Sequence, residues 1–255
     1  SGLNKVSKTI FRNAVLAVVG MVKLKDELKA DKKEYKPLVA ATMFGVTTPC
    51  VNFAREYLEK HGYEVLVFHA TGNGGKTMES LINAGLFKGV LDLTTTEWCD
   101  EVVGGALTAG SSRCEAAAKK GIPQVVSVGA LDMVNFGKIE TVPKRFKGRN
   151  LYKHNPTVTL MRTTVSECVE IGNKLVEKLN MVKGKTVLML PLNGVSAIDA
   201  EGQPFYGPEE DKVLFKTLKE GVNKEKVQIV EMKNNINDEK FGETAAKKLI
   251  ELMEN

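Results

Sequence analysis

The sequence predicts one α/β domain with a doubly wound, mostly parallel, Rossmann-like sheet, preceded by a long helix. Two observations lead to this fold class. From Pro37 onward, short apolar runs alternate with segments of helical periodicity that end at Gly, as strands and helices do in βαβ units. The runs are apolar throughout, which is typical of strands buried on both faces of a parallel sheet.

The first element is a helix over residues 3–29, because its apolar residues recur at helical spacing. No capping residue is recognisable at its start, where the apolar stripe already begins. We therefore expect residues 1–36 to be a linker helix from a missing or separate N-terminal domain, and residues 37–255 to form the Rossmann-like domain. The helix should pack against that N-terminal domain or against a second copy, in a homo-oligomer. The stripe consists of Leu3, Val6, Ile10, Ala14, Ala17, Val18 and Met21.

The remaining elements follow in alternation. Strands are expected at residues 38–43, 65–68, 89–93, 124–128, 158–161, 186–190 and 227–230. Helices are expected at residues 51–61, 78–84, 114–120, 165–179, 209–221 and from residue 238. One doubly wound sheet accounts for all of these strands. Residues 129–155 show no long periodic run, which indicates a lid, a binding loop, a subunit contact or simply a solvated crossover.

Composition excludes several classes of protein. The chain has 255 residues, 43% of them hydrophobic and 26% charged, as in ordinary globular proteins. Its four cysteines are widely spaced and match neither a metal site nor a disulfide framework, so a reduced, cytoplasmic protein without a metal is expected. No apolar run is long enough to span a membrane. A net charge of +5 is too small for a typical nucleic-acid-binding protein.

Polar residues and glycines follow the predicted strands. In parallel sheets ligands bind at the carboxyl ends of the strands, where helix N-termini offer unpaired N–H groups. A small anionic ligand, phosphorylated or carboxylated, is therefore expected at this edge, with Arg162 as its clamp. The expected ligand-binding residues are Thr47, Thr48, Thr71, Gly72, Gly74, Gly75, Thr95, Thr96, Asn135 and Arg162.

The glycine-rich segment 71–77 ends in Gly75-Lys76-Thr77, as a phosphate-binding P-loop does. The full P-loop pattern requires Gly at position 70, where this chain has Ala70. The weaker expectation is that the loop binds an anion through its backbone, since glycines allow close approach before a helix that begins near Lys76. The alternative is that these glycines serve only a tight turn and helix–sheet packing.

Two residues are candidates for catalysis. His69 lies at a strand end beside glycines and could act as a general acid or base, or could be a structural histidine. Cys50 follows Thr48-Pro49 in the first turn of a predicted helix, where the positive helix end lowers a thiol pKa. The alternative for Cys50 is a small core residue.

The loops themselves resemble a known family. Segments 43–51, 68–72, 128–137, 160–164 and 194–199 (MFGVTTPCV, FHATG, VGALDMVNFG, LMRTT and GVSAID) are similar to the tomato mosaic virus resistance protein family. The resemblance covers the whole chain and implies the connecting helix plus the second of two Rossmann-like halves. It also implies an ATP-binding family whose contacts with ATP lie in the first half, so the cofactor of this chain is unknown. The pair Lys76-Thr77 departs from the Arg-Ala usual there, which further weakens the P-loop interpretation.

Two functions are compatible with these observations. The chain could be half of a metabolic enzyme acting on a small anionic metabolite, with His69 as acid or base, although whether any reaction is catalysed stays open. It could instead be a nucleotide-responsive module that binds a protein, as the resemblance implies for the plant relative, which binds a viral replication helicase and inhibits viral RNA replication. The basic loop over residues 144–149 could make such a contact.

Overall fold

The computed structural model describes residues 3–28 and 35–254, in two units, residues 1–36 and residues 37–255. The first unit contains one helix, α1 (Lys5–Leu28). Contrary to the sequence analysis, this helix has a cap: the Asn4 side chain accepts hydrogen bonds from the backbone N–H groups of Val6 and Ser7, both at 3.0 Å. The apolar side chains of α1 are exposed, with Ile10 at 60% and Phe11 at 59%.

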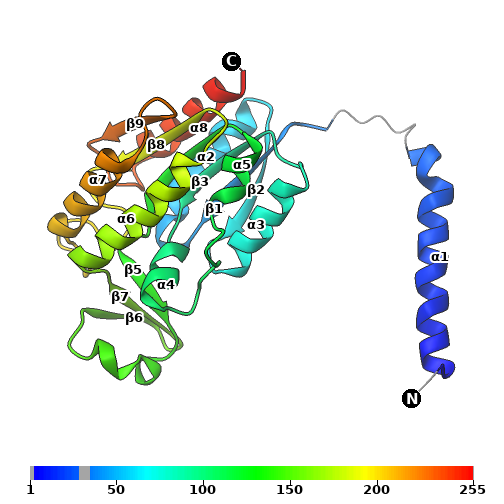
Figure 1. Ribbon diagram of the computed structural model, residues 1–255, viewed down its shortest axis with the longest axis horizontal. Coiled ribbons are helices and arrows are strands. Elements are labelled where there is room, and N and C mark those ends of the chain that lie inside the picture. The colour runs from blue at the N-terminus through cyan, green and yellow to red at the C-terminus, as the bar shows by residue number, and fades with distance from the viewer. Residues whose placement is uncertain (1–2, 29–34, 255) are drawn as a thin grey trace. The chain divides into compact units, whose positions relative to one another are not determined.

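The second unit is built on a six-stranded parallel sheet, as the sequence predicted. The strand order is β2-β1-β3-β4-β8-β9, and every neighbouring pair is parallel (Figure 1). The strands are β1 (Leu38–Met43), β2 (Glu64–His69), β3 (Gly89–Thr94), β4 (Gln124–Gly129), β8 (Thr186–Pro191) and β9 (Val227–Met232). The predicted strands agree with these bounds to within two residues.

Helices cover both faces of this sheet, which explains the continuously apolar strands. Helices α2 (Thr48–Lys60) and α8 (Glu239–Glu254) pack together on one face. The other face, toward the viewer in Figure 1, carries α3 (Asn73–Asn83), α5 (Glu115–Lys120), α6 (Val165–Asn180) and α7 (Pro208–Gly221). A short helix that the sequence did not predict, α4 (Glu97–Val103), packs against α6. Apolar cores lie on both sides of the sheet.

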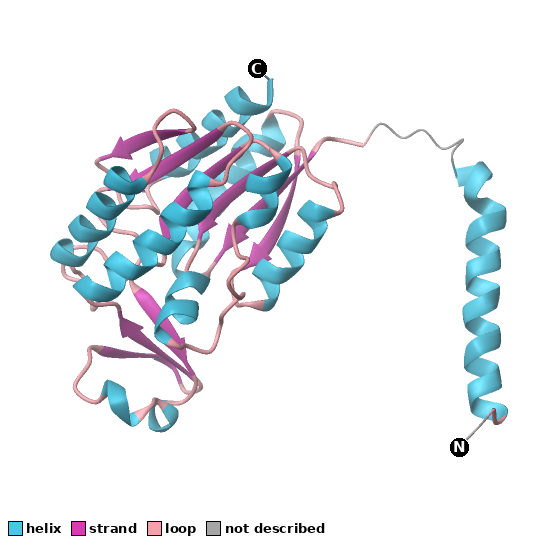
Figure 2. Cartoon of the chain, viewed as in Figure 1, coloured by secondary structure: helices cyan, strands magenta, loops and turns pink. Residues whose placement is uncertain are grey.

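A second, smaller sheet corrects the sequence analysis. Residues 158–161 do form a strand, β7 (Val158–Arg162), but it belongs to an antiparallel sheet with β5 (Met133–Phe136) and β6 (Leu151–Asn155) (Figure 2). The segment between β4 and β6, where the sequence showed no long periodic run, contains β5 and two short 3-10 helices, η2 (Ile139–Thr141) and η3 (Lys144–Phe146). A strand of about five residues carries too little pattern to show which sheet it joins.

The small sheet lies beside the carboxyl ends of the parallel strands. Its residues Met133 and Leu160 pack with Val46 and Ala130, which follow β1 and β4, in one apolar cluster. The loops after β3 and β4 are buried as a result. None of the helices in the described parts of the chain is long and apolar enough to cross a membrane.

Candidate functional site

Three of the threonines predicted to bind ligand form hydrogen bonds within the protein; Thr47 and Thr95 are buried and Thr48 is half-buried. The chain passes from β1 to β2 on one side of the sheet and from β3 to β4 on the other, so the connections after β1 and β3 diverge. At this point of divergence the hydroxyl oxygens of Thr47 and Thr94 lie 2.8 Å apart. Thr48 donates to the carbonyl of Phe44 at 3.1 Å, and Thr95 to that of Ser127 at 2.9 Å. This edge is where ligands of doubly wound sheets bind. In this structure the three threonines predicted from sequence, Thr47, Thr48 and Thr95, use their hydroxyls to hold the loops together.

Two further predicted ligand residues are also buried. The hydroxyl of Thr96 is buried and has no hydrogen-bond partner among the described residues. Asn135, on β5, donates from its backbone and its side-chain amide to the two carboxylate oxygens of Asp100, at 2.9 and 2.7 Å. Burial raises the pKa of Asp100 to about 7. Asn135 thus ties the small sheet to α4 in this structure.

The glycine-rich loop holds an anion, and that anion is the chain's own Glu97. The backbone N–H groups of Gly72 and Gly75 both donate to Glu97 Oε1, at 2.7 and 3.1 Å. A helix N-terminus suits a carboxylate, and binding of a separate anionic ligand by this loop stays a prediction. The sequence did not show that Glu97, at the start of α4, supplies the carboxylate. Thr71, also predicted to bind ligand, is exposed.

Glycine is required in this loop for packing, which supports the structural alternative. Helix α3 begins at Asn73, not near Lys76, so Gly74 and Gly75 lie in its first turn. A Cβ at Gly74 would overlap the carbonyl oxygen of His69, and one at Gly75 would overlap the Glu97 carboxylate. Gly72 has a φ of 83°, which favours glycine.

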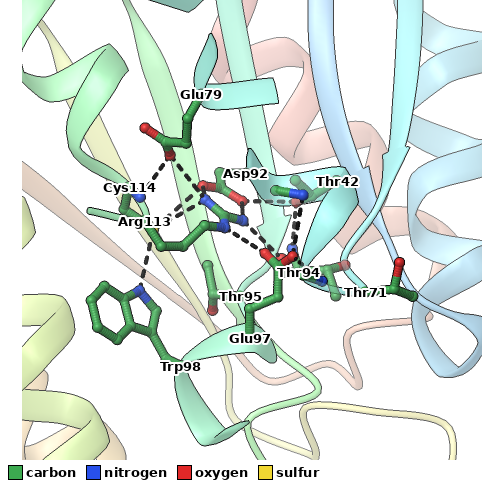
Figure 3. Close-up of polar contacts among 12 residues, drawn as sticks. Thr42, Thr71, Glu79, Asp92, Thr94, Thr95, Glu97, Trp98, Arg113 and Cys114 are labelled. Carbon is green, nitrogen blue, oxygen red and sulfur yellow. Dashed lines mark hydrogen bonds and ion pairs between the residues drawn. The ribbon is translucent and has the colours of Figure 1, made fainter. Parts of the chain in front are cut away.

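The Glu97 carboxylate is part of a larger buried cluster around Arg113 (Figure 3). Arg113 Nε donates to Glu97 Oε2 at 2.6 Å, and both terminal nitrogens of Arg113 donate to the Asp92 carboxylate, at 2.5 and 2.6 Å. The carboxylate of Glu79 lies 3.5 Å from Arg113 and accepts from the backbone N–H of Cys114. Arg113 is only 1% exposed, so this cluster fixes β3, α3 and α4 relative to one another.

Arg162 is likewise enclosed by the chain's own acceptors. Its Nη2 lies 2.9 Å from Asp211 Oδ1 and 3.4 Å from Asp199 Oδ1, and also donates to the carbonyl of Gly207. Its Nε donates to the carbonyl of Phe205 at 2.8 Å. With these partners and an exposure of 7%, the predicted clamp for a ligand instead anchors the segment between β8 and α7.

Three carboxyl groups share this single guanidinium. Burial, and then the neighbouring Asp199, raise the pKa of Asp211 to about 9. The same two causes raise the pKa of Asp132 to about 7. One oxygen of Asp132 accepts from Ser196 at 2.8 Å, while the other is buried and has no partner among the described residues. Asp211 is therefore expected to hold a proton at neutral pH.

A cleft of about 740 Å³ opens beside Asp211. It lies where β8 and β9 end and α7 and α8 begin, at the carboxyl edge of the sheet. Its polar lining includes the amides of Asn193 and Asn235 and the side chains of Tyr206 and Lys212. Tyr206, which is 50% exposed, presents its ring to the cleft. This cleft, with Asp211 at its wall, is the candidate site.

The protonation of Asp211 leads to a pH-dependent prediction. Its pKa is raised to about 9 from the ordinary value of 3.8, so between these values the folded chain binds a proton that the unfolded chain has released. The free energy of unfolding of the native chain should therefore fall as pH rises. An Asp211→Asn variant lacks this titration. Its free energy of unfolding relative to that of the native chain should therefore increase from pH 5 to pH 8, by up to about 4 kcal/mol.

Urea denaturation at several pH values measures this difference. Glu209→Gln, which removes an exposed carboxylate from the same turn of α7, is the control and should show no such trend. Parallel pH profiles for the native chain and Asp211→Asn would contradict the prediction.

The two candidates for catalysis lie away from this cleft. His69 is the exposed last residue of β2. This strand is the first in the order of the sheet, whereas β8 and β9 are the last two. Cys50 is fully buried, and burial raises the pKa of its thiol. The helix end does not lower this pKa, because Cys50 faces the core between α2 and the sheet. The structure favours the core alternative for Cys50, and a catalytic role for His69 stays a prediction.

Sequence reasoning missed several residues of these clusters. A charged residue inside an apolar strand, as Asp92 is in β3, requires a buried partner, so this signal was present. No comparable signal marks Asp199 or Asp211, because both lie in polar segments. Their burial depends on contacts with Arg162, which is distant in sequence.

Comparison with known proteins identifies the family. Residues 36–253 match the model of the C-terminal domain of an uncharacterised protein family, UPF0261. The chain belongs to the UPF0261 family. A UPF0261 protein of Clostridium tetani is 68% identical over the whole chain, which spans 62% of that protein. The UPF0261 protein RA0729 of Rhizobium meliloti is 49% identical over 96% of the chain, which spans 61% of that protein.

Plant relatives of this UPF0261 chain confirm the resemblance seen in the sequence. The ToMV resistance protein Tm-1(GCR237) of Solanum lycopersicum is 46% identical over 98% of the chain, which spans 34% of that protein. The ToMV susceptible protein tm-1(GCR26) of the same plant is also 46% identical over 98%. The sequence identity to this chain is therefore the same for the plant protein named for resistance and for the one named for susceptibility.

Proposed function

We propose that this UPF0261 C-terminal domain binds a small polar molecule in the cleft between β8, β9 and α7. The observation that carries the proposal is the position of Asp211, a buried carboxyl group with a raised pKa at the wall of an open cleft. Carboxyl groups with this property occur preferentially at functional sites. The place also agrees with the general rule that ligands of parallel sheets bind at the carboxyl ends of the strands.

The charges of the lining favour a neutral or cationic ligand over the anion expected from sequence. Of the two lysines in the cleft, Lys219 is paired with Glu231 at 2.8 Å, which leaves Lys212. Glu201 and Asp238 add negative charge, and Asp211 adds more whenever it loses its proton. The other two candidate anion sites already have partners within the chain: the glycine-rich loop binds the Glu97 carboxylate, and Arg162 is enclosed by Asp199, Asp211 and two backbone carbonyls.

Amides, a tyrosine and a protonated carboxyl group together suit a ligand with hydroxyl or amino groups. Asn193, which is exposed, offers both donors and acceptors, and Tyr206 offers a ring face and a hydroxyl. The amide of Asn235 already donates to the carbonyls of Asn193 and Ser196, so it shapes the wall of the cleft. Asp211 is placed to donate its proton to a ligand or to accept one in return. Incubation of a bound ligand with the protein tests whether this proton exchange serves binding alone or a reaction.

A thermal-shift screen tests the proposal. Small amines and polyols are compared with phosphate and simple carboxylates, and a ligand at 100 times its dissociation constant should add about 2.7 kcal/mol of stability. Tyr206→Ala should abolish the shift, while Tyr35→Ala, which removes an 82% exposed ring outside the domain, should not. A hit is then incubated with the protein and followed for chemical change. Stabilisation only by phosphate or carboxylates, unchanged in Tyr206→Ala, would contradict the proposal.

A second candidate function is contact with a protein, as expected in the sequence analysis. Two surfaces favour it: the basic segment after β5, and the apolar face of α1. A partner domain or a second copy on α1 stays a prediction.

Charging the apolar face of α1 should weaken self-association or domain association. Ile10→Asp combined with Val18→Asp places two charges on side chains that are 60% and 54% exposed in the single chain. Because exposed apolar stripes of this size mark contact surfaces, we expect the native chain to be an oligomer by light scattering and the variant to shift toward the monomer. A native chain that is monomeric at high concentration would contradict the expectation of a homo-oligomer.

A further inference from the structure

Charge is distributed unevenly over the domain. Residues 37–255 contain 27 Lys+Arg and 27 Asp+Glu, so the domain as a whole is neutral. Residues 137–154, which we name the basic tip, contain six of the basic residues and only one acidic residue, Glu140. The rest of the domain is therefore net negative. A neutral domain that gathers its positive charge in one short segment has a directed field, which attracts acidic partners to that segment.

The basic tip is held in a defined shape. Phe146 is 8% exposed and lies beneath two guanidinium groups, with Arg145 at 4.7 Å and Arg149 at 5.8 Å from the ring centre. Arg145 donates to the carbonyl of Val103, and Arg149 donates to both carboxylate oxygens of Glu167, at 2.9 and 2.7 Å. The two arginines thus support the tip instead of facing solvent freely.

The lysines of the tip are the groups left for a partner. Lys138, Lys144, Lys147 and Lys153 are all exposed, and within residues 3–28 and 35–254 no carboxylate forms an ion pair with them. Ile139, which follows Lys138 in the same segment, is 40% exposed. Figure 1 shows the segment, around β6, projecting from the end of the domain. An exposed apolar side chain in a segment with exposed lysines offers the two kinds of group, apolar and charged, that protein interfaces combine.

We propose that the basic tip is a docking surface for an acidic protein segment that carries apolar side chains. Its lysines would pair with carboxylates, and Ile139 would pack against an apolar residue of the partner. A nucleic acid is less suited, because proteins that bind single strands stack bases on exposed aromatic rings. In the tip, Phe146 is buried beneath its arginines and the half-buried Tyr152 packs against Phe205. The proposal is independent of the ligand cleft, which lies beside β8, β9 and α7.

Fluorescence anisotropy with defined probes tests the proposal at 150 mM salt. The probes are a labelled 15-residue peptide of Glu-Glu-Leu repeats, the same peptide with Gln in place of Glu, and a 15-nucleotide oligouridine. The native chain should bind the acidic peptide and neither of the other probes. Lys144→Glu combined with Lys147→Glu should weaken binding by about tenfold or more, as expected for the loss and reversal of two charge pairs. Ile139→Ser should weaken it by about threefold.

The control variant replaces two lysines outside the basic tip by glutamate. Lys183 and Lys185 are exposed and lie outside the tip, before β8, so Lys183→Glu combined with Lys185→Glu changes the net charge equally. This variant should bind the acidic peptide as the native chain does. Equal losses in both double variants would show a net-charge effect and overturn the proposal. So would tighter binding of oligouridine than of the peptide, or no peptide binding by the native chain.

Discussion

Replacing Arg113 by Met is expected to lower the free energy of unfolding by about 3–5 kcal/mol, or to prevent folding altogether. Methionine fills much of the same volume but leaves the carboxylates of Asp92 and Glu97 buried without their cation. Removing one partner of a buried ion pair costs more than the pair contributes, because the remaining charge is not solvated. Here two carboxylates lose hydrogen bonds of 2.5–2.6 Å.

Urea denaturation followed by circular dichroism measures the effect. Arg55→Met is the matched control, because the side chain of Arg55 is 40% exposed and its nearest carboxylate, on Glu59, lies 3.9 Å away. That variant should change stability by about 0.5 kcal/mol or less. Neutralising both carboxylates in the Arg113→Met background, with Asp92→Asn and Glu97→Gln, should recover part of the loss. A loss below about 1 kcal/mol for Arg113→Met alone would refute the role assigned to the cluster.

Gly74→Ala is expected to destabilise the domain by about 2–4 kcal/mol. Alanine is the better helix former by about 1 kcal/mol, so local propensity in the first turn of α3 predicts the opposite sign. The close packing against β2 decides the outcome, because the added Cβ would overlap the carbonyl oxygen of His69. A backbone atom in a strand cannot move aside as a flexible side chain can, so α3 must shift away from the sheet.

Gly45→Ala is the control for this substitution. Nothing lies within 4 Å of a Cβ added at Gly45, which follows β1 at the same edge of the sheet. This variant should be close to the native chain in stability. Equal stability of both variants would show that α3 does not approach β2 as closely as described. The same contact means that a bulkier residue at Gly74 would disturb the loop itself and could not report separately on ligand binding.

Sequence alone determined most of the parallel fold. Continuous apolar runs such as residues 38–43 and 186–190 predicted buried strands, and Gly62, Gly85 and Gly121 marked the ends of the helices between them. These features are local: the period of apolar residues and the conformational freedom of glycine act over a few residues.

Only the tertiary structure decided which hydrogen-bond and ion-pair partners each buried polar group has. Glu97 reaches Gly72 across 25 residues, and Asp211 reaches Arg162 across 49, and no local pattern encodes such pairs. The same holds for β7, whose five residues suit either sheet and join the antiparallel one through contacts with β5 and β6. Burial then changes the chemistry: it turns the predicted clamp Arg162 into an anchor, keeps the Cys50 thiol protonated and leaves Asp211 with a proton beside an open cleft. Periodicity fixes which residues face inward, whereas the partner of a buried charge depends on how distant segments pack.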